Sequence, residues 1–231
     1  MPPPERAQAL AALQKGDRAG ARRACEAAVA DGRADADIWH ILGIIEAQEN
    51  RPSSAVQAFV ASIEASPEHV GSLTNLALLH RRSGRADLAL PLYRRALDLD
   101  ATNPATHRAL ASTYLALGDE ENALLSAERA LRIDPRDASA RRIRLNSLIQ
   151  SESAETPLAE VERLIAEAPD DHANHFLASL AYGRLGREED ARVALRRCLS
   201  LNARHHQAMN NLARLHFEAG DYPEARRLYE A

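Results

Sequence analysis

The chain has 231 residues, of which 45% are hydrophobic, 27% are charged and only 4% are aromatic. Its formal net charge is −4, so it has no overall basic surface for nucleic acid. No run of 18 apolar residues is present, which excludes a membrane-spanning helix, and the scarcity of aromatic residues disfavours strands.

Short amphipathic helices are predicted in pairs from one end of the chain to the other. Counting from Pro2 in steps of 34 gives seven units without an insertion. Each unit is predicted to be two helices joined by a tight turn, and neither helix could bury its apolar stripe alone. The predicted units begin at residues 2, 36, 70, 104, 138, 172 and 206.

Three places in this 34-residue frame keep one kind of side chain. The eighth place is small in six of the seven units, and the twentieth is alanine in six of the seven. Small residues let paired helices approach closely, while glycine or asparagine at the turn accepts the left-handed conformation that ends a helix. The residues at the turn are Gly16, Asn50, Gly84, Gly118, Glu152, Gly186 and Gly220.

The units are not equally regular along the chain. The first has a polar start, which suits a solvated cap, and units two to four (36–137) are the most regular. Unit five (138–171) is degenerate, with Pro157 in place of the alanine. Unit seven ends within its second helix, which predicts either self-association there or a longer chain.

Two arginines of unit five, Arg141 and Arg144, occupy places that normally face the neighbouring helix. They are interpreted as sequence drift with snorkelling side chains. The two alternatives are a more flexible junction between repeats, or arginines that are turned toward a partner.

Unit two carries the pattern that is most specific. Its characteristic residues are Trp39, Leu42, Gly43, Ala55, Phe59, Ser62 and Pro67. This pattern resembles the tetratricopeptide repeat signature, in its bacterial form, and the resemblance covers the whole chain. It implies an all-α fold, an α-α superhelix or solenoid of tandem helix-turn-helix units in a single domain, 1–231. It also implies a concave groove, lined by the first helix of each pair, that holds other proteins or peptides.

On this resemblance, the groove residues lie on the first helices and face away from the second. Arginine recurs among them, so the groove would be locally positive and would favour acidic segments or C-terminal carboxylates. The alternative is that these arginines only solubilise the helices. Asn75 and Asn211 share one place and resemble the amides that hold peptide backbone in the family's glycosyltransferase-linked arrays. The predicted partner-binding residues are His40, Thr74, Asn75, Arg81, Arg82, Arg108, Arg142, Asn146, Phe176, Arg184, Asn210, Asn211 and Arg214.

Nine histidines raise the question of a metal site. His172 and His175 share a helix face and His205 and His206 are adjacent, yet no cysteine or carboxylate cluster completes a four-ligand site. The sequence also has no glycine-rich phosphate loop, nucleophile elbow or HExxH motif. We therefore expect no catalytic residue, no cofactor and no metal ion.

The sequence favours a non-enzymatic scaffold that binds a partner protein or peptide segment, and no nucleic acid or membrane. One alternative is an N-terminal substrate-recruiting arm of a larger enzyme, with a sulfotransferase- or glycosyltransferase-like domain beyond residue 231. Another is a scaffold that self-assembles through its uncapped C-terminal repeat. Cys25 and Cys198 lie too many repeats apart to pair, and the N-terminus has no signal-peptide pattern, so a cytoplasmic location is predicted.

Overall fold

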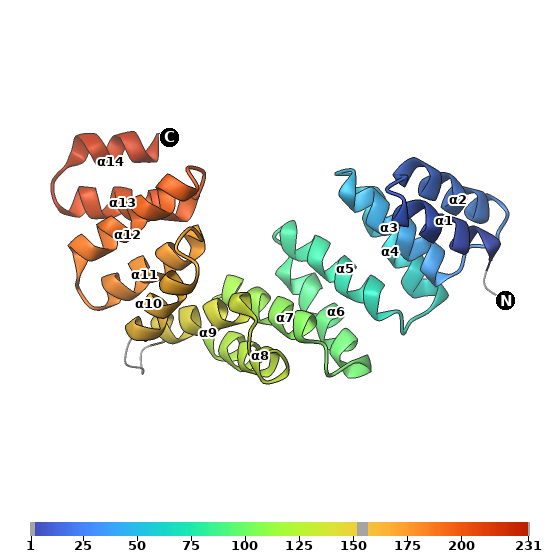
Figure 1. Ribbon diagram of the computed structural model, residues 1–231, viewed down its shortest axis with the longest axis horizontal. Helices are drawn as coiled ribbons and strands as arrows, with labels where there is room; N and C mark the ends of the chain where they lie inside the picture. Colours follow the sequence, from blue (N-terminus) through green and yellow to red (C-terminus); the bar gives the residue numbers. More distant parts are fainter. Residues whose placement is uncertain (1–2, 152–156, 231) are drawn as a thin grey trace. The chain divides into compact units, whose positions relative to one another are not determined.

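The computed structural model describes residues 3–151 and 157–230. Within these ranges the regular structure consists of fourteen α-helices, without a strand. The two helices of a repeat pack as a hairpin in repeats one, two, three, six and seven, as Figure 1 shows for α3 (Ala36–Gln48) beside α4 (Pro52–Ala65). The predicted all-α fold of tandem helix-turn-helix units is confirmed.

The first helices of the repeats begin where the 34-residue frame predicts. Six of them have thirteen residues and start at the first place of their unit, and α1 starts at Pro4. Their bounds are α1 (Pro4–Gln14), α3 (Ala36–Gln48), α5 (Val70–Arg82), α7 (Pro104–Ala116), α9 (Ala138–Gln150), α11 (His172–Arg184) and α13 (His206–Glu218).

The second helices follow after short turns. Pro157, the irregular residue of unit five, is the N-cap immediately before α10. The bounds of the second helices are α2 (Arg18–Ala30), α4 (Pro52–Ala65), α6 (Ala86–Leu99), α8 (Glu120–Ile133), α10 (Leu158–Glu167), α12 (Glu188–Leu201) and α14 (Tyr222–Tyr229).

Acceptor side chains fix the starts of the first helices. The Asp35 carboxylate accepts a hydrogen bond from the Ile38 amide at 2.9 Å, which satisfies an amide that has no partner inside the helix. His69 and His205 do the same with an imidazole nitrogen. The residues that cap first helices in this way are Asp35, His69, Asn103, Asp137, Asp171 and His205.

The predicted turn residues adopt the left-handed conformation. Asn50 has a φ of 57°, although it is not a glycine. The glycines at the same place with positive φ are Gly16, Gly84, Gly118, Gly186 and Gly220. Glu152, which holds this place in unit five, lies outside the described residues.

The chain divides into two compact units. One comprises residues 1–117 with 132–135, and the other comprises residues 118–131 with 136–231. In the first compact unit, α1 to α6 pack as three hairpins, and each hairpin contacts the first helix of the following repeat. In the second compact unit, α11 packs on α12, α13 packs on α14, and α12 contacts α13.

Small residues allow this close packing. Ala55 and Ala89, at the twentieth place, are completely buried, and Gly43 at the eighth place faces the ring of Phe59. A Cβ at Gly43 would lie 2.6 Å from Phe59 Cε1, which is closer than carbon atoms can approach. The large side chain at the twenty-fourth place therefore fills the space that the small one leaves.

The two arginines of unit five pair within their own repeat. Arg141 bonds to Glu167 at 3.0 Å, and Arg144 bonds to both carboxylate oxygens of Glu160 at 2.5 Å. These ion pairs join α9 to α10, so the two side chains are engaged inside the protein rather than turned toward a partner.

Within residues 3–151 and 157–230, no helix combines the length and the apolar character that a membrane span requires.

Candidate functional site

A small hollow, called hollow A here, lies on the first helices α3 and α5 of the first compact unit. Its volume is about 110 Å³, and Phe59 of α4 forms part of its wall. Asn75 presents an amide to it and Arg82 presents a guanidinium. The residues that line hollow A are Ile44, Ala47, Gln48, Phe59, Asn75, Leu78, Leu79 and Arg82.

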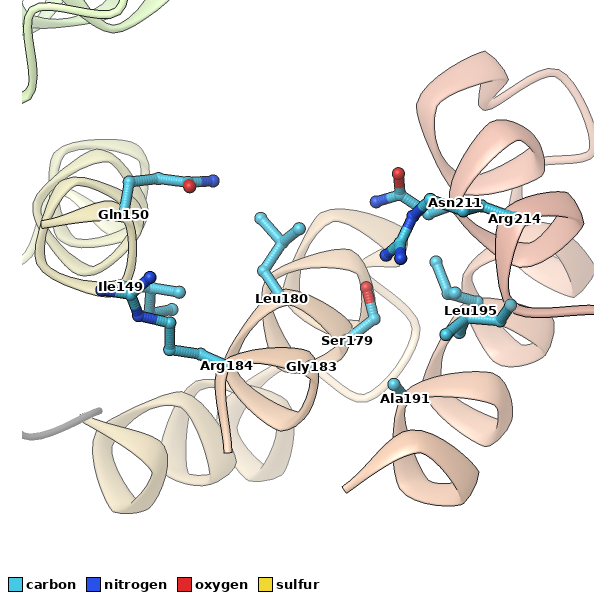
Figure 2. A pocket seen from close by; sticks show the side chains of 11 residues that line it. Ile149, Gln150, Ser179, Leu180, Gly183, Arg184, Ala191, Leu195, Asn211 and Arg214 are labelled. Atoms are coloured by element: carbon cyan, nitrogen blue, oxygen red, sulfur yellow. The ribbon is translucent and has the colours of Figure 1, made fainter. Parts of the chain in front are cut away.

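A larger hollow, called hollow B here, lies in the second compact unit. Its volume is about 280 Å³, and its walls come from α9, α11, α12 and α13. Figure 2 shows Leu180 in the middle, between Gln150 on one side and Asn211 on the other. The residues that line hollow B are Ile149, Gln150, Ser179, Leu180, Gly183, Arg184, Ala191, Leu195, Asn211, Arg214 and Leu215.

The two hollows occupy the same place in the repeat frame. Asn75 and Asn211 both stand at the sixth place of a repeat, four repeats apart. Seven of the eight residues that line hollow A have a counterpart, shifted by four repeats, in hollow B. These counterparts are Ile44 and Leu180, Ala47 and Gly183, Gln48 and Arg184, Phe59 and Leu195, Asn75 and Asn211, Leu78 and Arg214, and Leu79 and Leu215.

Two of these exchanges put a smaller side chain in the wall of hollow B. Leu195 replaces the aromatic ring of Phe59, and Gly183 replaces the methyl group of Ala47. Each exchange removes side-chain volume from the wall, and hollow B also extends to Ile149 of α9.

Hollow B also carries more positive charge than hollow A. Arg184 and Arg214 line it, and none of its lining residues is acidic. Arg184 donates a hydrogen bond to the Ser151 carbonyl at 3.0 Å, and Arg214 forms an exposed ion pair with Glu218 at 2.7 Å. The exposed ion pair of Arg214 contributes little, and Arg184 uses only one of its five N–H donors on the Ser151 carbonyl, so both guanidinium groups can still bind a carboxylate from a partner.

Five of the thirteen residues predicted to bind a partner line one of these hollows. They are Asn75, Arg82, Arg184, Asn211 and Arg214. Their role in binding remains a prediction, since their position shows only that each of them lines a hollow of its own compact unit.

Other predicted residues make contacts within the protein. His40 bonds to the Ser72 hydroxyl at 2.9 Å, and its pKa is lowered to about 4, mainly because burial disfavours the charged ring. Arg142 pairs with Asp171, and the Phe176 ring lies 4.6 Å from that of His205. Thr74 donates to the Val70 and Gly71 carbonyls, and Arg81 reaches Ser112.

The remaining three predicted residues differ in exposure. Asn210 is exposed on α13, and Arg108 is half-buried on α7. Asn146 on α9 is half-buried, and its Oδ1 atom has no hydrogen-bond partner among the described residues.

Sequence reasoning missed some of the wall of hollow B. Gln150, Gly183 and Leu195 line it but were not among the predicted residues. A four-repeat shift from Ala47 and Phe59 would have found Gly183 and Leu195, because equivalent places recur in the frame.

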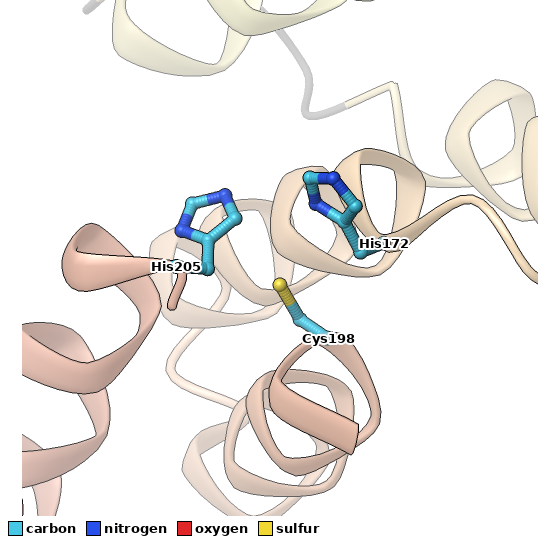
Figure 3. Close-up of side chains that lie close together, drawn as sticks. All are labelled: His172, Cys198 and His205. Carbon is cyan, nitrogen blue, oxygen red and sulfur yellow. The ribbon is translucent and has the colours of Figure 1, made fainter. Parts of the chain in front are cut away.

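The structure groups the histidines differently from the sequence interpretation. The ligand atoms of His172, Cys198 and His205 all lie within 4.8 Å of one another (Figure 3). His175 bonds to the Pro169 carbonyl at 2.7 Å, and His206 is exposed. His172 therefore lies in a cluster with His205 and not with His175, and a cysteine, which the sequence did not place there, lies beside these two histidines.

Comparison with known proteins decides the family. Residues 6–70 and 176–231 match one family model described as tetratricopeptide repeat, and residues 68–136 match a second with the same description. The chain belongs to the tetratricopeptide repeat family. Proteins of this family serve as scaffolds for protein interactions, and the predicted family is confirmed.

Individual relatives are distant. The chain is 26% identical over 187 residues to tetratricopeptide repeat protein 8 of Caenorhabditis elegans, covering 79% of this chain and 36% of that protein. It therefore spans about a third of the length of this curated relative.

Two solved structures show the same fold at low identity. A tetratricopeptide repeat protein from Parabacteroides merdae superposes with a TM-score of 0.81 at 15% identity, covering 98% of this chain and 90% of that one. YrrB, described as a tetratricopeptide repeat protein with an unusual peptide-binding site, gives 0.64 at 16% identity, covering 80% of this chain and 95% of that one.

Proposed function

We propose that this tetratricopeptide repeat protein is a non-enzymatic scaffold that holds a segment of a partner protein at hollow B. The observation that carries the proposal is the recurrence of one hollow, with an asparagine at the same place, in repeats two and three and again in repeats six and seven. The description of YrrB as a peptide-binding member of the same fold is consistent with it.

The chemistry of hollow B suits a segment of polypeptide. The Asn211 amide can donate and accept at once, as a peptide backbone requires. Leu180 and Leu195 offer apolar surface to a side chain, and the nearby arginines offer charge. A volume of about 280 Å³ is below the range of about 300–1,000 Å³ typical of small-molecule pockets. The hollow therefore fits one or two side chains of a larger partner.

The two guanidinium groups favour an acidic segment. Arg184 and Arg214 stand on neighbouring first helices, α11 and α13, and both line the same hollow. A carboxylate between them would accept charge-assisted hydrogen bonds, which are about twice as strong as neutral ones. We therefore propose an aspartate, a glutamate or a C-terminal carboxylate at this point of the partner.

Several other expectations also remain proposals. A cytoplasmic location is supported by two cysteines that are free and buried, since isolated thiols persist in reducing compartments. A single array over 1–231 is supported by the unbroken 34-residue frame. Two alternatives remain: the arm of a larger enzyme, which would use the same groove, and a scaffold that self-assembles through its C-terminal repeat.

A displayed library of short random peptides tests the proposal. Peptides selected on the full chain should be enriched in aspartate and glutamate. Binding of one selected peptide is then measured by fluorescence anisotropy. The double variant R184E/R214E should weaken it by at least about tenfold, because two favourable charges become repulsive. The variant N211A should weaken it as well.

The matched control reverses two arginines outside the hollow. Arg163 and Arg197 are exposed on α10 and α12, and neither lines hollow B. R163E/R197E makes the same change in net charge and should leave binding unchanged. Selected peptides that are basic, or that bind R184E/R214E as well as the wild type, would refute the proposed site.

A further inference from the structure

Two histidines and a cysteine meet where repeat six joins repeat seven. His172 begins α11, Cys198 lies on α12, and His205 is the N-cap of α13. Their ligand atoms lie within 4.8 Å of one another, as Figure 3 shows. We propose that these three side chains form a binding site for a borderline-soft divalent cation, with Zn²⁺ as the preferred ion.

The spacing is close to that of a metal site. Zinc lies about 2.0–2.1 Å from imidazole nitrogen and about 2.3 Å from thiolate sulfur, so tetrahedral ligands are about 3.3–3.6 Å apart. A contraction of about 1 Å, by rotation of side chains, would bring the three ligand atoms to these separations. The two rings are already close, with centroids 5.3 Å apart.

The surroundings of His172 and Cys198 leave room for a missing partner. The Nδ1 atom of His172 is buried and has no hydrogen-bond partner among the described residues. Its Nε2 atom lies 3.4 Å from the side-chain nitrogen of Asn202. Cys198 is completely buried beside it. Buried polar nitrogens are almost always satisfied, so a cation at this point would supply the partner that this nitrogen lacks.

His205 is held in place by its capping role. Its Nδ1 atom accepts a hydrogen bond from the Ala208 amide at 3.2 Å. The ring of Phe176 lies against it at 4.6 Å between centroids. These contacts limit the motion of the imidazole. If a cation binds Nε2, the proton moves to Nδ1 and the coordinate bond replaces the cap bond.

The equivalent junction four repeats earlier provides a comparison within the same chain. There Ala36 holds the place of His172, Ser62 that of Cys198 and His69 that of His205. Ser62 donates to the Ala36 carbonyl at 2.7 Å, and His69 Nε2 bonds to Asp37 at 3.2 Å. That junction is satisfied by hydrogen bonds within the protein.

The later junction has lost those partners and gained soft donors. Ala173 stands at the place of Asp37, so the carboxylate that bonds to His69 has no counterpart beside His205. A thiol replaces the serine hydroxyl, and an imidazole replaces a methyl group. The exchange converts a hydrogen-bonded junction into a set of two nitrogens and one sulfur.

This donor set selects the class of ion. Imidazole and thiolate favour zinc and similar ions, whereas magnesium and calcium require oxygen ligands. Three protein ligands leave one position for water or another group. Because the ligands come from α11, α12 and the start of α13, a bound ion would fasten repeat seven to repeat six.

Titration of the full, reduced, metal-free chain with Co²⁺ tests the proposal. Co²⁺ takes the place of zinc and reports thiolate coordination by a charge-transfer absorption band. We expect one equivalent of Co²⁺ to bind, the band to appear, and Zn²⁺ to displace it. C198S should abolish the band, while C25S should retain it, since Cys25 is equally buried but belongs to no group of three possible ligands among the described residues.

The histidine variants complete the test. H172A and H205A should lower Co²⁺ affinity by more than about tenfold, since loss of a group that merely supports a ligand costs about 10–100-fold. H206A should not, because His206 is exposed beside the site. H172A and C198S place at this junction the residues found at the earlier one, so both variants should fold, which circular dichroism checks.

Zinc should also raise the melting temperature of the wild type and of C25S but not of H172A. Failure to bind Co²⁺, binding without a thiolate band, or a band that survives in C198S would each overturn the proposed site.

Discussion

Gly183 is the last residue but one of α11 and forms part of the wall of hollow B. In a helix interior, alanine is more favourable than glycine by about 0.8–1.0 kcal/mol, because glycine loses more backbone freedom on folding, and the difference is smaller in the last turn. A Cβ at Gly183 would meet no atom within 4 Å, so overpacking does not offset this gain. We therefore expect G183A to raise the free energy of unfolding by up to about 1 kcal/mol.

The matched control is the same substitution three residues later. Gly186 has a φ of 69°, and a Cβ there would also meet no atom within 4 Å. A left-handed backbone costs other residues about 1–2 kcal/mol, partly offset by a less flexible unfolded chain. G186A should therefore lower the free energy of unfolding by about 1 kcal/mol.

Urea denaturation followed by circular dichroism measures both variants. With m of about 1–3 kcal/mol/M, a change of about 1 kcal/mol moves the midpoint by about 0.3–1 M. Since neither methyl group meets another atom, opposite shifts would come from the backbone alone. Midpoints that move in the same direction would refute this reasoning.

G183A also separates the effect of a substitution on stability from its effect on peptide binding. Because the methyl group that G183A adds points into open space in hollow B, this variant should bind the selected peptide more weakly while its fold is stabilised. G186A, outside the lining residues, should not change the affinity of the folded protein. Unchanged affinity in G183A would mean that the peptide does not enter this part of the hollow.

Three further predictions concern single side chains. R22A should lower the free energy of unfolding, measured by urea denaturation, by about 1–3 kcal/mol, because it removes a cation beside the buried Glu46. R197A breaks an exposed ion pair and should lower it by less than about 1 kcal/mol. Equal losses in the two variants would contradict this. N50G should raise the midpoint slightly, because glycine accepts the φ of 57° without strain, and a lower midpoint would show that the asparagine side chain matters more. The pKa of His40 falls from 6.5 to about 4 on folding, so the contribution of this histidine to stability is complete above pH 6.5 and is lost as the pH falls toward 4. H40F should therefore make the melting temperature depend less on pH between 6.5 and 4. An unchanged pH dependence in H40F would argue against this assignment.

The sequence was sufficient to predict the helix pairs and, in six of the seven repeats, the residue at which the first helix begins. Their signals are local: Asp35 caps one helix, Gly84 ends another, and Ala55 recurs at a fixed spacing. Each of these residues acts through its own backbone or through the adjacent helix. The 34-residue frame therefore placed six of the first helices at the correct residue.

The candidate site was predictable only in part. Asn211 and Arg214 were identified because their repeat places determine the face of α13 on which they lie. Arg142 was placed in the same groove, yet it pairs with Asp171, 29 residues away. A pairing of this kind depends on side-chain reach across a junction, which a repeat pattern does not specify.

The approach of Cys198 to His172 was missed for the same reason. The two residues belong to different helices of one repeat, and the third member of the cluster, His205, is the N-cap of the next repeat's first helix. Only the packing of α12 against α11 and the start of α13 brings them together.

The correspondence between the two histidine-capped junctions has a consequence for engineering and for evolution. His69 already occupies the place of His205, so A36H and S62C would be enough to install the same three donors between repeats two and three. In a chain built from one frame, a chemical feature that arises at one junction can be copied to another by a few point mutations. The junctions can thus acquire new chemistry while the helices on either side keep their packing.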